Sequence, residues 1–361
     1  MQGIELSGRF YADIVRPFLD RSAPDLPHAA ALLGYGSELL GFDDDTSRDH
    51  NWGPRVQIIL GQDDFAAHAR TLVADFARVA PPDFLGEPIG WRARPHPPAD
   101  GPGSAGTLVH GLEFHTLEAI LDSHFALQSL AGLKPKDWLG FPEQKLLAFT
   151  AGAVFHDDTG RLTQARATLA YFPDDIWLYR IACQWRRIAE EQAFVGRAGQ
   201  VGDDLGSRVI AARLARDVMA MGFLLERRYA PYAKWFGFGF ARLPIANRLT
   251  PHLQRALCAT DWTARGDALA AAYLELAQAQ NARGIAPFSP VLSPYHERPF
   301  TTINADDAVA AAHAAIVDPM IKKLPLVGAI DQLSDLTPLL TDPHLSQTMM
   351  RQLSVPKITG T

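Results

Sequence analysis

The feature that most constrains the fold is a change in the sequence pattern near residue 140. Before this point, short apolar runs alternate with turns that contain Gly or Pro. The clearest run, from Val56 to Leu60, is rich in β-branched residues and lies between Pro54 and Gly61, which predicts a strand. The same reasoning predicts a strand that ends in the turn at 29–36, strands at 87–92 and 107–115, and helices at 6–20 and 63–79.

After residue 140 the apolar residues recur at helical spacing. Trp177, Ile181, Trp185 and Ile188 follow one another at steps of four, four and three, so they form one face of a helix. Further helices are predicted at 210–225, 264–282 and 305–317, with a loop at 287–299. The chain is therefore predicted to hold a mixed α+β domain at residues 1–140, followed at 141–361 by an all-α helical bundle.

Composition excludes several classes of protein. The 361 residues include 34 Lys and Arg against 40 Asp and Glu, so the net charge is −6, which disfavours nucleic acid or an anionic membrane as a partner. The two cysteines lie far apart in the sequence and exclude a disulfide framework. No uncharged apolar run approaches the ~18 residues of a membrane span. We expect a cytoplasmic protein, and the sequence leaves a homodimer open.

The most informative segment reads GYGSELLGFDDDTSRDHNWGPRVQIIL, at residues 34–60. Gly36 and Ser37 lie where a predicted strand turns into a helix. Backbone N–H groups at such a turn point toward an incoming anion, and glycine lets that anion approach closely. These two residues are therefore candidates for binding phosphate groups.

Three further residues are candidates for a metal site. Asp49 and Asn51 are two positions apart in an extended segment, so their oxygen atoms face the same side. Glu113, in the predicted strand LVHGLEF, is the best candidate for a third ligand. Mg²⁺ and Mn²⁺ prefer such oxygen ligands together with substrate phosphates.

The order of these residues resembles the nucleotidyltransferase superfamily. The shared pattern is a glycine–serine pair, a spacer, an acid two residues before a second polar ligand, and a later acid. A wider resemblance, to an uncharacterised bacterial family defined by a domain of unknown function, rests on FYADIVRPFL, GYGSELLGFDDDTSRDHNWGPR, YFPDDIW, RRYAPYAKW and LPLVGAIDQ. The resemblance implies a polymerase-beta-like core plus a helical bundle. It also implies metal-dependent transfer of a nucleoside monophosphate from an NTP, with ATP as the default, to a hydroxyl of a small molecule.

The same resemblance implies a role for each candidate residue. Asp49 would hold the metal, with Asn51 and Glu113 assisting, while Gly36 and Ser37 would hold the leaving phosphates. The cations that complete the phosphate site would be Arg48, Arg55 and Lys234.

Two alternatives stay open. Asn51 stands where the superfamily has a second acid, and an uncharged amide points to a catalytically decayed nucleotide-binding module with a regulatory or antitoxin-like role. Separately, the adjacent pair His156-Asp157 is typical of HD-type metal phosphohydrolases, for which His110, His115 and His124 are available as further ligands. Residues 157–160 also read as an ordinary tight turn.

Overall fold

The computed structural model describes residues 1–44, 46, 52–89, 91–92, 108–109 and 111–353. The chain divides into two compact units: the first holds Met1–Gly132 and Lys145–Ala170, and the second holds Leu133–Gln144 and Tyr171–Thr361. The mixed α/β character predicted from the sequence is confirmed. This division differs from the predicted boundary after residue 140, because residues 145–170 return to the first unit and add a strand to its sheet.

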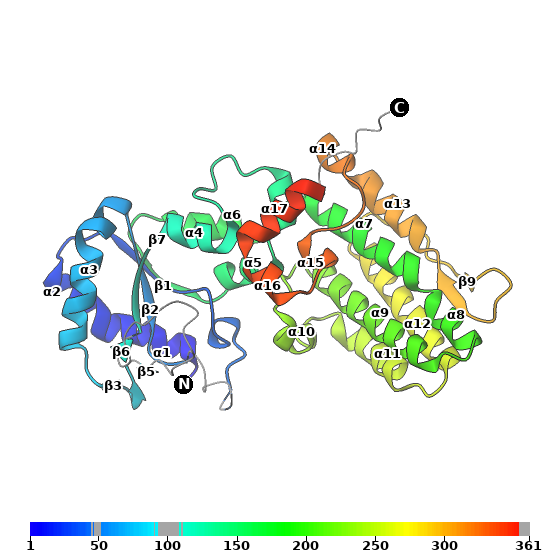
Figure 1. Ribbon diagram of the computed structural model, residues 1–361, viewed down its shortest axis with the longest axis horizontal. Coiled ribbons are helices and arrows are strands. Elements are labelled where there is room, and N and C mark those ends of the chain that lie inside the picture. Colours follow the sequence, from blue (N-terminus) through cyan, green and yellow to red (C-terminus); the bar gives the residue numbers. More distant parts are fainter. Residues whose placement is uncertain (45, 47–51, 90, 93–107, 110, 354–361) are drawn as a thin grey trace. The chain divides into compact units, whose positions relative to one another are not determined.

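The first unit is built on a sheet of four strands in the order β7-β2-β1-β8 (Figure 1). The strands are β1 (His28–Leu32), β2 (Val56–Leu60), β7 (Leu112–Thr116) and β8 (Ala153–Asp157). β1 runs antiparallel to both β2 and β8, whereas β2 and β7 are parallel. The predicted strand from Val56 to Leu60 is confirmed.

Helices pack on one face of this sheet and bury its apolar side chains. They are α1 (Gly3–Phe10), the π-helix η1 (Tyr11–Val15), α2 (Arg16–Ser22) and α3 (Gln62–Val79). Phe10, Phe18 and Phe76 from these helices pack in one core with Ile58 of β2 and Phe114 of β7. The predicted helices at 6–20 and 63–79 are therefore confirmed, with a π turn in the first.

The remaining elements of the first unit are short. The 3₁₀ helix η2 (Glu38–Leu40) follows β1, and the other helices are α4 (Leu117–Phe125), α6 (Arg161–Thr168) and most of α5 (Glu143–Thr150). Two small hairpins pair β3 (Asp83–Phe84) with β4 (Glu87–Pro88), and β5 (Trp91–Arg92) with β6 (Leu108–Val109). The strands predicted at 87–92 and 107–115 are thus divided into shorter pieces.

The second unit is mainly helical. Its helices are the 3₁₀ helix η4 (Pro135–Gly140), α7 (Asp174–Glu191), α8 (Phe194–Gln200), α9 (Asp204–Leu225), α10 (Ala233–Phe240), α11 (Ala246–Cys258), α12 (Trp262–Ala282), α13 (Ala305–Ala315), α14 (Pro319–Lys322), α15 (Ile330–Leu333), α16 (Thr337–Thr341) and α17 (Pro343–Leu353). The expectation of an all-α bundle needs one correction. β9 (Leu292–Pro294) lies within the predicted loop at 287–299 and pairs with β10 (Thr301–Ile303), which follows that loop.

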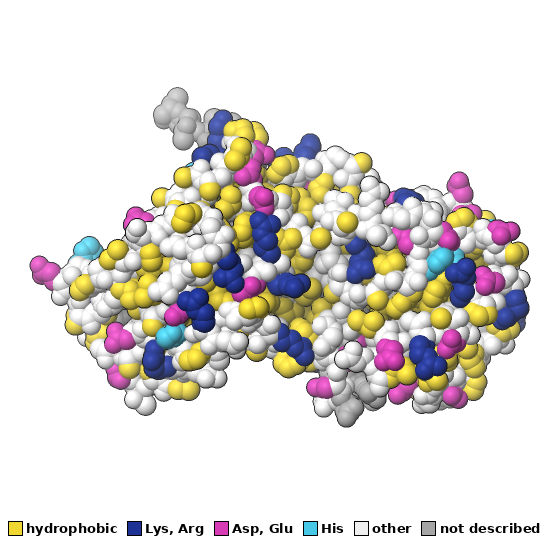
Figure 2. All heavy atoms as spheres, turned by 180° about the vertical axis from the view of Figure 1, so that it is seen from behind, with side chains coloured by type: hydrophobic (Ala, Val, Ile, Leu, Met, Phe, Trp, Pro, Cys, Tyr) yellow, Lys and Arg dark blue, Asp and Glu magenta, His cyan; other side chains and the backbone are white. Residues whose placement is uncertain are grey.

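The face predicted for α7 lies in the core of the second unit. Ile181, Trp185 and Ile188 are fully buried, and α7 packs against α9 and α13. Across the described part of the chain, no helix has both the length and the apolar character that crossing a bilayer requires. On the face shown in Figure 2, basic and acidic side chains lie interspersed among apolar ones.

A buried charge cluster joins four segments of the second unit. Arg180 forms ion pairs with Glu143 and, at 3.6 Å between Nη1 and Oδ2, with Asp331. Glu143 Oε2 also accepts a hydrogen bond of 2.8 Å from the backbone N–H of Ala230. Burial raises the pKa of both carboxyl groups, and the charge of Arg180 opposes that rise. Arg180 thus neutralises two acids that the core holds away from water.

We predict that Arg180→Leu destabilises the second unit by about 3–5 kcal/mol, because it leaves two buried carboxyl groups without their counter-ion. The measurement is the free energy of unfolding in urea, followed by tryptophan fluorescence. The control is Arg186→Leu, which removes an exposed arginine one turn and a half further along α7 and should cost at most about 1 kcal/mol. Equal effects of the two substitutions would contradict this assignment.

Candidate functional site

The turn after β1 holds two of the predicted residues. Gly36 has a φ of +107°, and a side chain there would collide with the carboxylate of Glu38 and the guanidinium of Arg55. Ser37 precedes η2, and its side chain forms no capping hydrogen bond. The helix predicted to begin here is a single 3₁₀ turn that ends at Gly41, in the left-handed conformation. The positive end of its dipole is therefore much weaker than that of the longer helix predicted from the sequence.

Arg55 and Glu38 form the buried ion pair that shapes this turn. Only 3% of Arg55 and 2% of Glu38 is exposed. Arg55 donates to Glu38 Oε1 from Nε at 2.9 Å and from Nη2 at 2.6 Å, and it also donates to the carbonyl oxygen of Tyr35. Because Glu38 neutralises this guanidinium, we reinterpret Arg55 as a residue that positions the turn, in place of the predicted phosphate contact.

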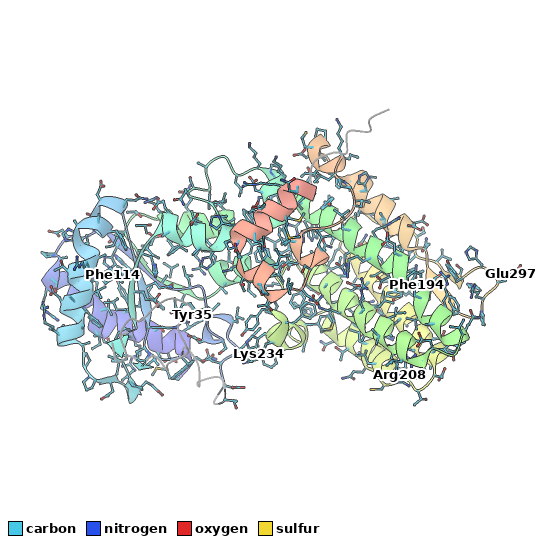
Figure 3. The ribbon with its side chains drawn as sticks, viewed as in Figure 1. Tyr35, Phe114, Phe194, Arg208, Lys234 and Glu297 are labelled. Carbon is cyan, nitrogen blue, oxygen red and sulfur yellow. The ribbon has the colours of Figure 1, made fainter. Side chains whose placement is uncertain are left out.

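Tyr35, which is labelled in Figure 3, lies in this turn and contacts the predicted acid on β7. Its ring lies against the guanidinium of Arg55, with 4.1 Å between Cζ and the ring centroid. Its hydroxyl donates to Glu113 Oε1 at 2.5 Å. The structure therefore brings together Gly36, Arg55 and Glu113, with Tyr35 between them.

Two neighbouring side chains hold the other oxygen of Glu113. Gln57 lies opposite Glu113 in the parallel pairing of β2 with β7, and its Nε2 donates to Oε2 at 3.3 Å. His115 lies two residues along β7, on the same face, with its Nε2 3.1 Å from Oε2. Gln57 Oε1 also accepts a hydrogen bond of 3.1 Å from the backbone N–H of Leu33, which fixes its orientation.

This environment keeps Glu113 ionised. Burial by itself would raise the pKa of Glu113, but the hydrogen bonds from His115, Tyr35 and Gln57 and the charge of His115 lower it to about 2. Burial and the bond to Glu113 raise the pKa of Tyr35 to about 12. At neutral pH the cluster thus presents a carboxylate beside a neutral phenol.

His124 of α4 lies beside the same turn. Its Nδ1 lies 2.9 Å from the carbonyl oxygen of Ile120, so it donates there, and its Nε2 faces the turn at Gly34. Burial, followed by the charge of Lys145, lowers the pKa of His124 to about 4. His124 is therefore neutral above that pH and turns an acceptor nitrogen toward the turn.

The other predicted residues fall into two groups. Asp49, Asn51 and Arg48 lie outside the described residues. Lys234 is an exposed residue of α10 in the second unit, where its Nζ lies 4.9 Å from the centroid of the Trp235 ring. Two acids at the C-terminal part of α9 are engaged in other contacts: Asp217 is buried against Gln184 and Arg187, and Glu226 is paired with Arg283.

The histidines proposed for an HD-type site do not gather around His156. His115 and His124 lie beside Glu113 and the Gly34 turn, while His110 lies outside the described residues. His156 is instead close to His28 and Asp158, a pairing that sequence spacing could not reveal because β1 and β8 are so far apart in the chain.

Comparison with known families and proteins gives one match. Residues 138–236 match the model of a family described as Domain of unknown function (DUF4037). The predicted resemblance to a domain-of-unknown-function family is thus confirmed over this segment, which contains α7 and α9. No curated protein matches the chain.

We predict that Glu113 stabilises the first unit in a pH-dependent manner. Because the pKa of Glu113 is near 2 in the folded state against an ordinary value of 4.5, its contribution is complete above pH 4.5 and is lost as the pH falls toward 2. The Tm difference between the unaltered protein and Glu113→Gln should therefore be largest near neutral pH and shrink below about pH 5. Glu5→Gln, which removes an exposed acid from the first turn of α1, should change Tm much less than Glu113→Gln does at neutral pH. A Tm difference for Glu113→Gln that does not vary with pH would contradict the prediction.

Proposed function

We propose that this protein is a metal-dependent nucleotidyltransferase, which transfers a nucleoside monophosphate from an NTP to a hydroxyl group of a small molecule. ATP is the default donor. The observation that carries the proposal is the juxtaposition of the ionised Glu113 carboxylate with the Gly34–Gly36 turn, through Tyr35. The Glu113 carboxylate, which would bind the metal, therefore lies beside the turn that the sequence predicts to bind the phosphates.

The donor set fits a hard divalent cation such as Mg²⁺ or Mn²⁺. An ionised carboxylate offers about four lone pairs, and three of those on Glu113 accept hydrogen bonds from Tyr35, Gln57 and His115. One lone pair on Oε1 stays available for a metal. Asp49 and Asn51 would supply the other oxygens. A divalent cation held there would neutralise charge on the triphosphate and align it for in-line attack.

The protein's own groups have separate tasks in this proposal. Tyr35, Gln57 and His115 fix the orientation of the Glu113 carboxylate, so that it need not reorganise when substrate binds. Arg55 and Glu38 fix the conformation of the turn at Gly36, and their ion pair fills the space beside its Cα. The sequence assigns Arg48 and Lys234 to the phosphates, and that assignment stays a prediction.

A second candidate is a nucleotide-binding module without catalysis. Asn51 favours it, because an amide contributes no negative charge and so weakens metal binding at the pair Asp49/Asn51. In that case the protein would bind a nucleotide without Mg²⁺ and would not turn it over. Isothermal calorimetry with ATP, with and without Mg²⁺, separates the two candidates.

We predict that incubation with ATP labelled at the α-phosphate, Mg²⁺ or Mn²⁺, and an extract of small metabolites yields a labelled product. Glu113→Gln and Asp49→Ala should each lower the rate about 100-fold or more, since each removes an anionic metal ligand worth several kcal/mol. Glu5→Gln is the matched control and should retain the full rate.

Absence of transfer from every nucleotide tested, together with metal-independent nucleotide binding that Asn51→Asp leaves without turnover, would replace the enzyme proposal with the binding module. Transfer that persists in both Asp49→Ala and Glu113→Gln would show that the chemistry lies elsewhere.

A further inference from the structure

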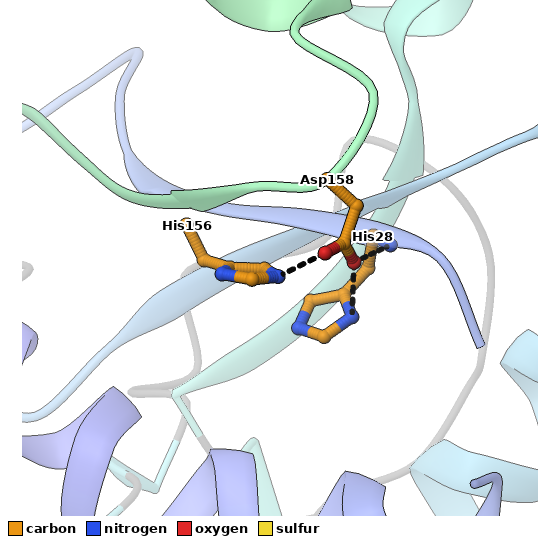
Figure 4. Close-up of side chains that lie close together, drawn as sticks. All are labelled: His28, His156 and Asp158. Atoms are coloured by element: carbon orange, nitrogen blue, oxygen red, sulfur yellow. Dashed lines mark hydrogen bonds and ion pairs between the residues drawn. The ribbon is translucent and has the colours of Figure 1, made fainter. Parts of the chain in front are cut away.

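A second cluster of metal-ligating side chains lies in the first unit, where β8 ends against the beginning of β1 (Figure 4). His28 is the first residue of β1, His156 lies in β8, and Asp158 follows β8 directly. Two backbone contacts fix Asp158 against His28. The N–H of His28 donates to Asp158 Oδ2 at 3.0 Å, and the N–H of Asp158 donates to the carbonyl oxygen of His28 at 3.1 Å.

The two imidazoles approach different oxygens of the same carboxylate. His156 Nε2 lies 2.8 Å from Asp158 Oδ1, and His28 Nδ1 lies 3.7 Å from Asp158 Oδ2. One ligand atom from each residue lies within 4.8 Å of the other two. Ligands 2.0–2.2 Å from a tetrahedral Zn²⁺ are about 3.3 Å from one another, so these separations bracket the spacing that the ion requires.

We propose that His28, His156 and Asp158 bind a transition-metal ion of the Zn²⁺ class. Two imidazole nitrogens and one carboxylate are ligands that suit Zn²⁺ and its neighbours in the first transition row, and they suit Mg²⁺ poorly. Three protein ligands leave a position for water. Asp158 is exposed and His156 is partly exposed, so the ion reaches the buried His28 from the side of Asp158.

Tyr11 supplies the outer hydrogen bond that a ligating histidine needs. Its hydroxyl lies 2.9 Å from His28 Nε2, and His28 Nδ1 lies 3.0 Å from the carbonyl oxygen of Leu26. Without metal, Nδ1 carries the proton and donates to Leu26. On binding, the proton resides on Nε2 and is donated to Tyr11, whose hydroxyl changes from donor to acceptor. The ring must then turn so that the Nδ1 lone pair leaves the carbonyl oxygen of Leu26, which loses its donor, and faces the ion. Tyr11 is the first residue of the π turn Tyr11–Val15.

Arg16 is the group that competes with the ion. Its Nη1 lies 3.4 Å from both His156 Nδ1 and the Tyr11 hydroxyl, and its Nε is already bonded to Asp20 at 3.1 Å. Arginine only donates, so His156 Nδ1 accepts in this arrangement and Nε2 carries the proton. Metal binding at Nε2 moves that proton to Nδ1 and requires Arg16 to turn toward Asp20, which its partly exposed side chain allows.

This site is distinct from the Glu113 cluster. His28 pairs with Leu60 at one end of β1, whereas Gln57 and Glu113 lie beside Ala31 at the other. The side chains also leave opposite faces of the sheet, because His28 shares a face with Leu60 and Gln57 does not. The ion would tie β8 to β1, whose pairing shifts register between Ala30 and Ala31.

The test is a titration of the full chain, freed of metal with EDTA, with Co²⁺ followed by visible absorption, and then with Zn²⁺ in competition. We expect one ion per chain and loss of the Co²⁺ bands on adding Zn²⁺. His156→Gln and Asp158→Asn should each weaken binding about 100-fold, and Tyr11→Phe about tenfold. The matched control is His68→Gln, an exposed histidine of α3, which should bind as the unaltered protein does.

Absence of Co²⁺ and Zn²⁺ binding, or binding that both His156→Gln and Asp158→Asn leave unchanged, would overturn the proposal. Far-UV circular dichroism checks that each variant is folded. If His156→Gln unfolds, Asp158→Asn still tests the proposal, because Asp158 is exposed. Glu113→Gln separates this proposal from the proposed function, since it should abolish nucleotidyl transfer and leave Co²⁺ binding intact.

Discussion

The buried ion pair of Arg55 with Glu38 is the interaction on which the candidate site depends. It lies under the turn after β1, where it requires glycine at position 36 and supports the ring of Tyr35. Tyr35 in turn donates to Glu113. A buried pair of this kind contributes little net stability, since desolvation offsets most of its attraction. Its effect is therefore to specify one conformation of the turn.

The second unit uses buried charge in a similar way. Arg180 neutralises Glu143 and Asp331, and its guanidinium also lies 4.4 Å from the centroid of the Phe172 ring. Glu143 and Phe172 lie in the segment that matches the family of unknown function, and so does Arg180. These contacts help hold that segment together, because Arg180, Glu143 and Phe172 are all buried.

The sequence predicts those elements whose own periodicity decides their structure. Val56–Leu60 is an apolar run bounded by Pro and Gly, and α7 has one continuous apolar face, so both were predictable. β8 was not, because its residues are all partly exposed and its pairing with β1 depends on contacts distant in the chain. The role of Arg55 could not be predicted either. An arginine beside a candidate phosphate site has the same sequence signature whether it binds phosphate or pairs with Glu38.

Both polar clusters of the first unit depend on the same strand. β1 is five residues long, buried throughout and built from His28, three alanines and a leucine. Its small side chains let helices pack closely on the sheet, while its length separates its ends by about 13 Å. β1 carries no polar side chain between its ends, so the polar side chains lie where the strand begins and in the turn that follows it. One end then carries imidazoles suited to a borderline metal, and the other adjoins a carboxylate suited to a hard one. Under the two proposals, this difference in ligand chemistry would let a single small sheet distinguish two kinds of cation.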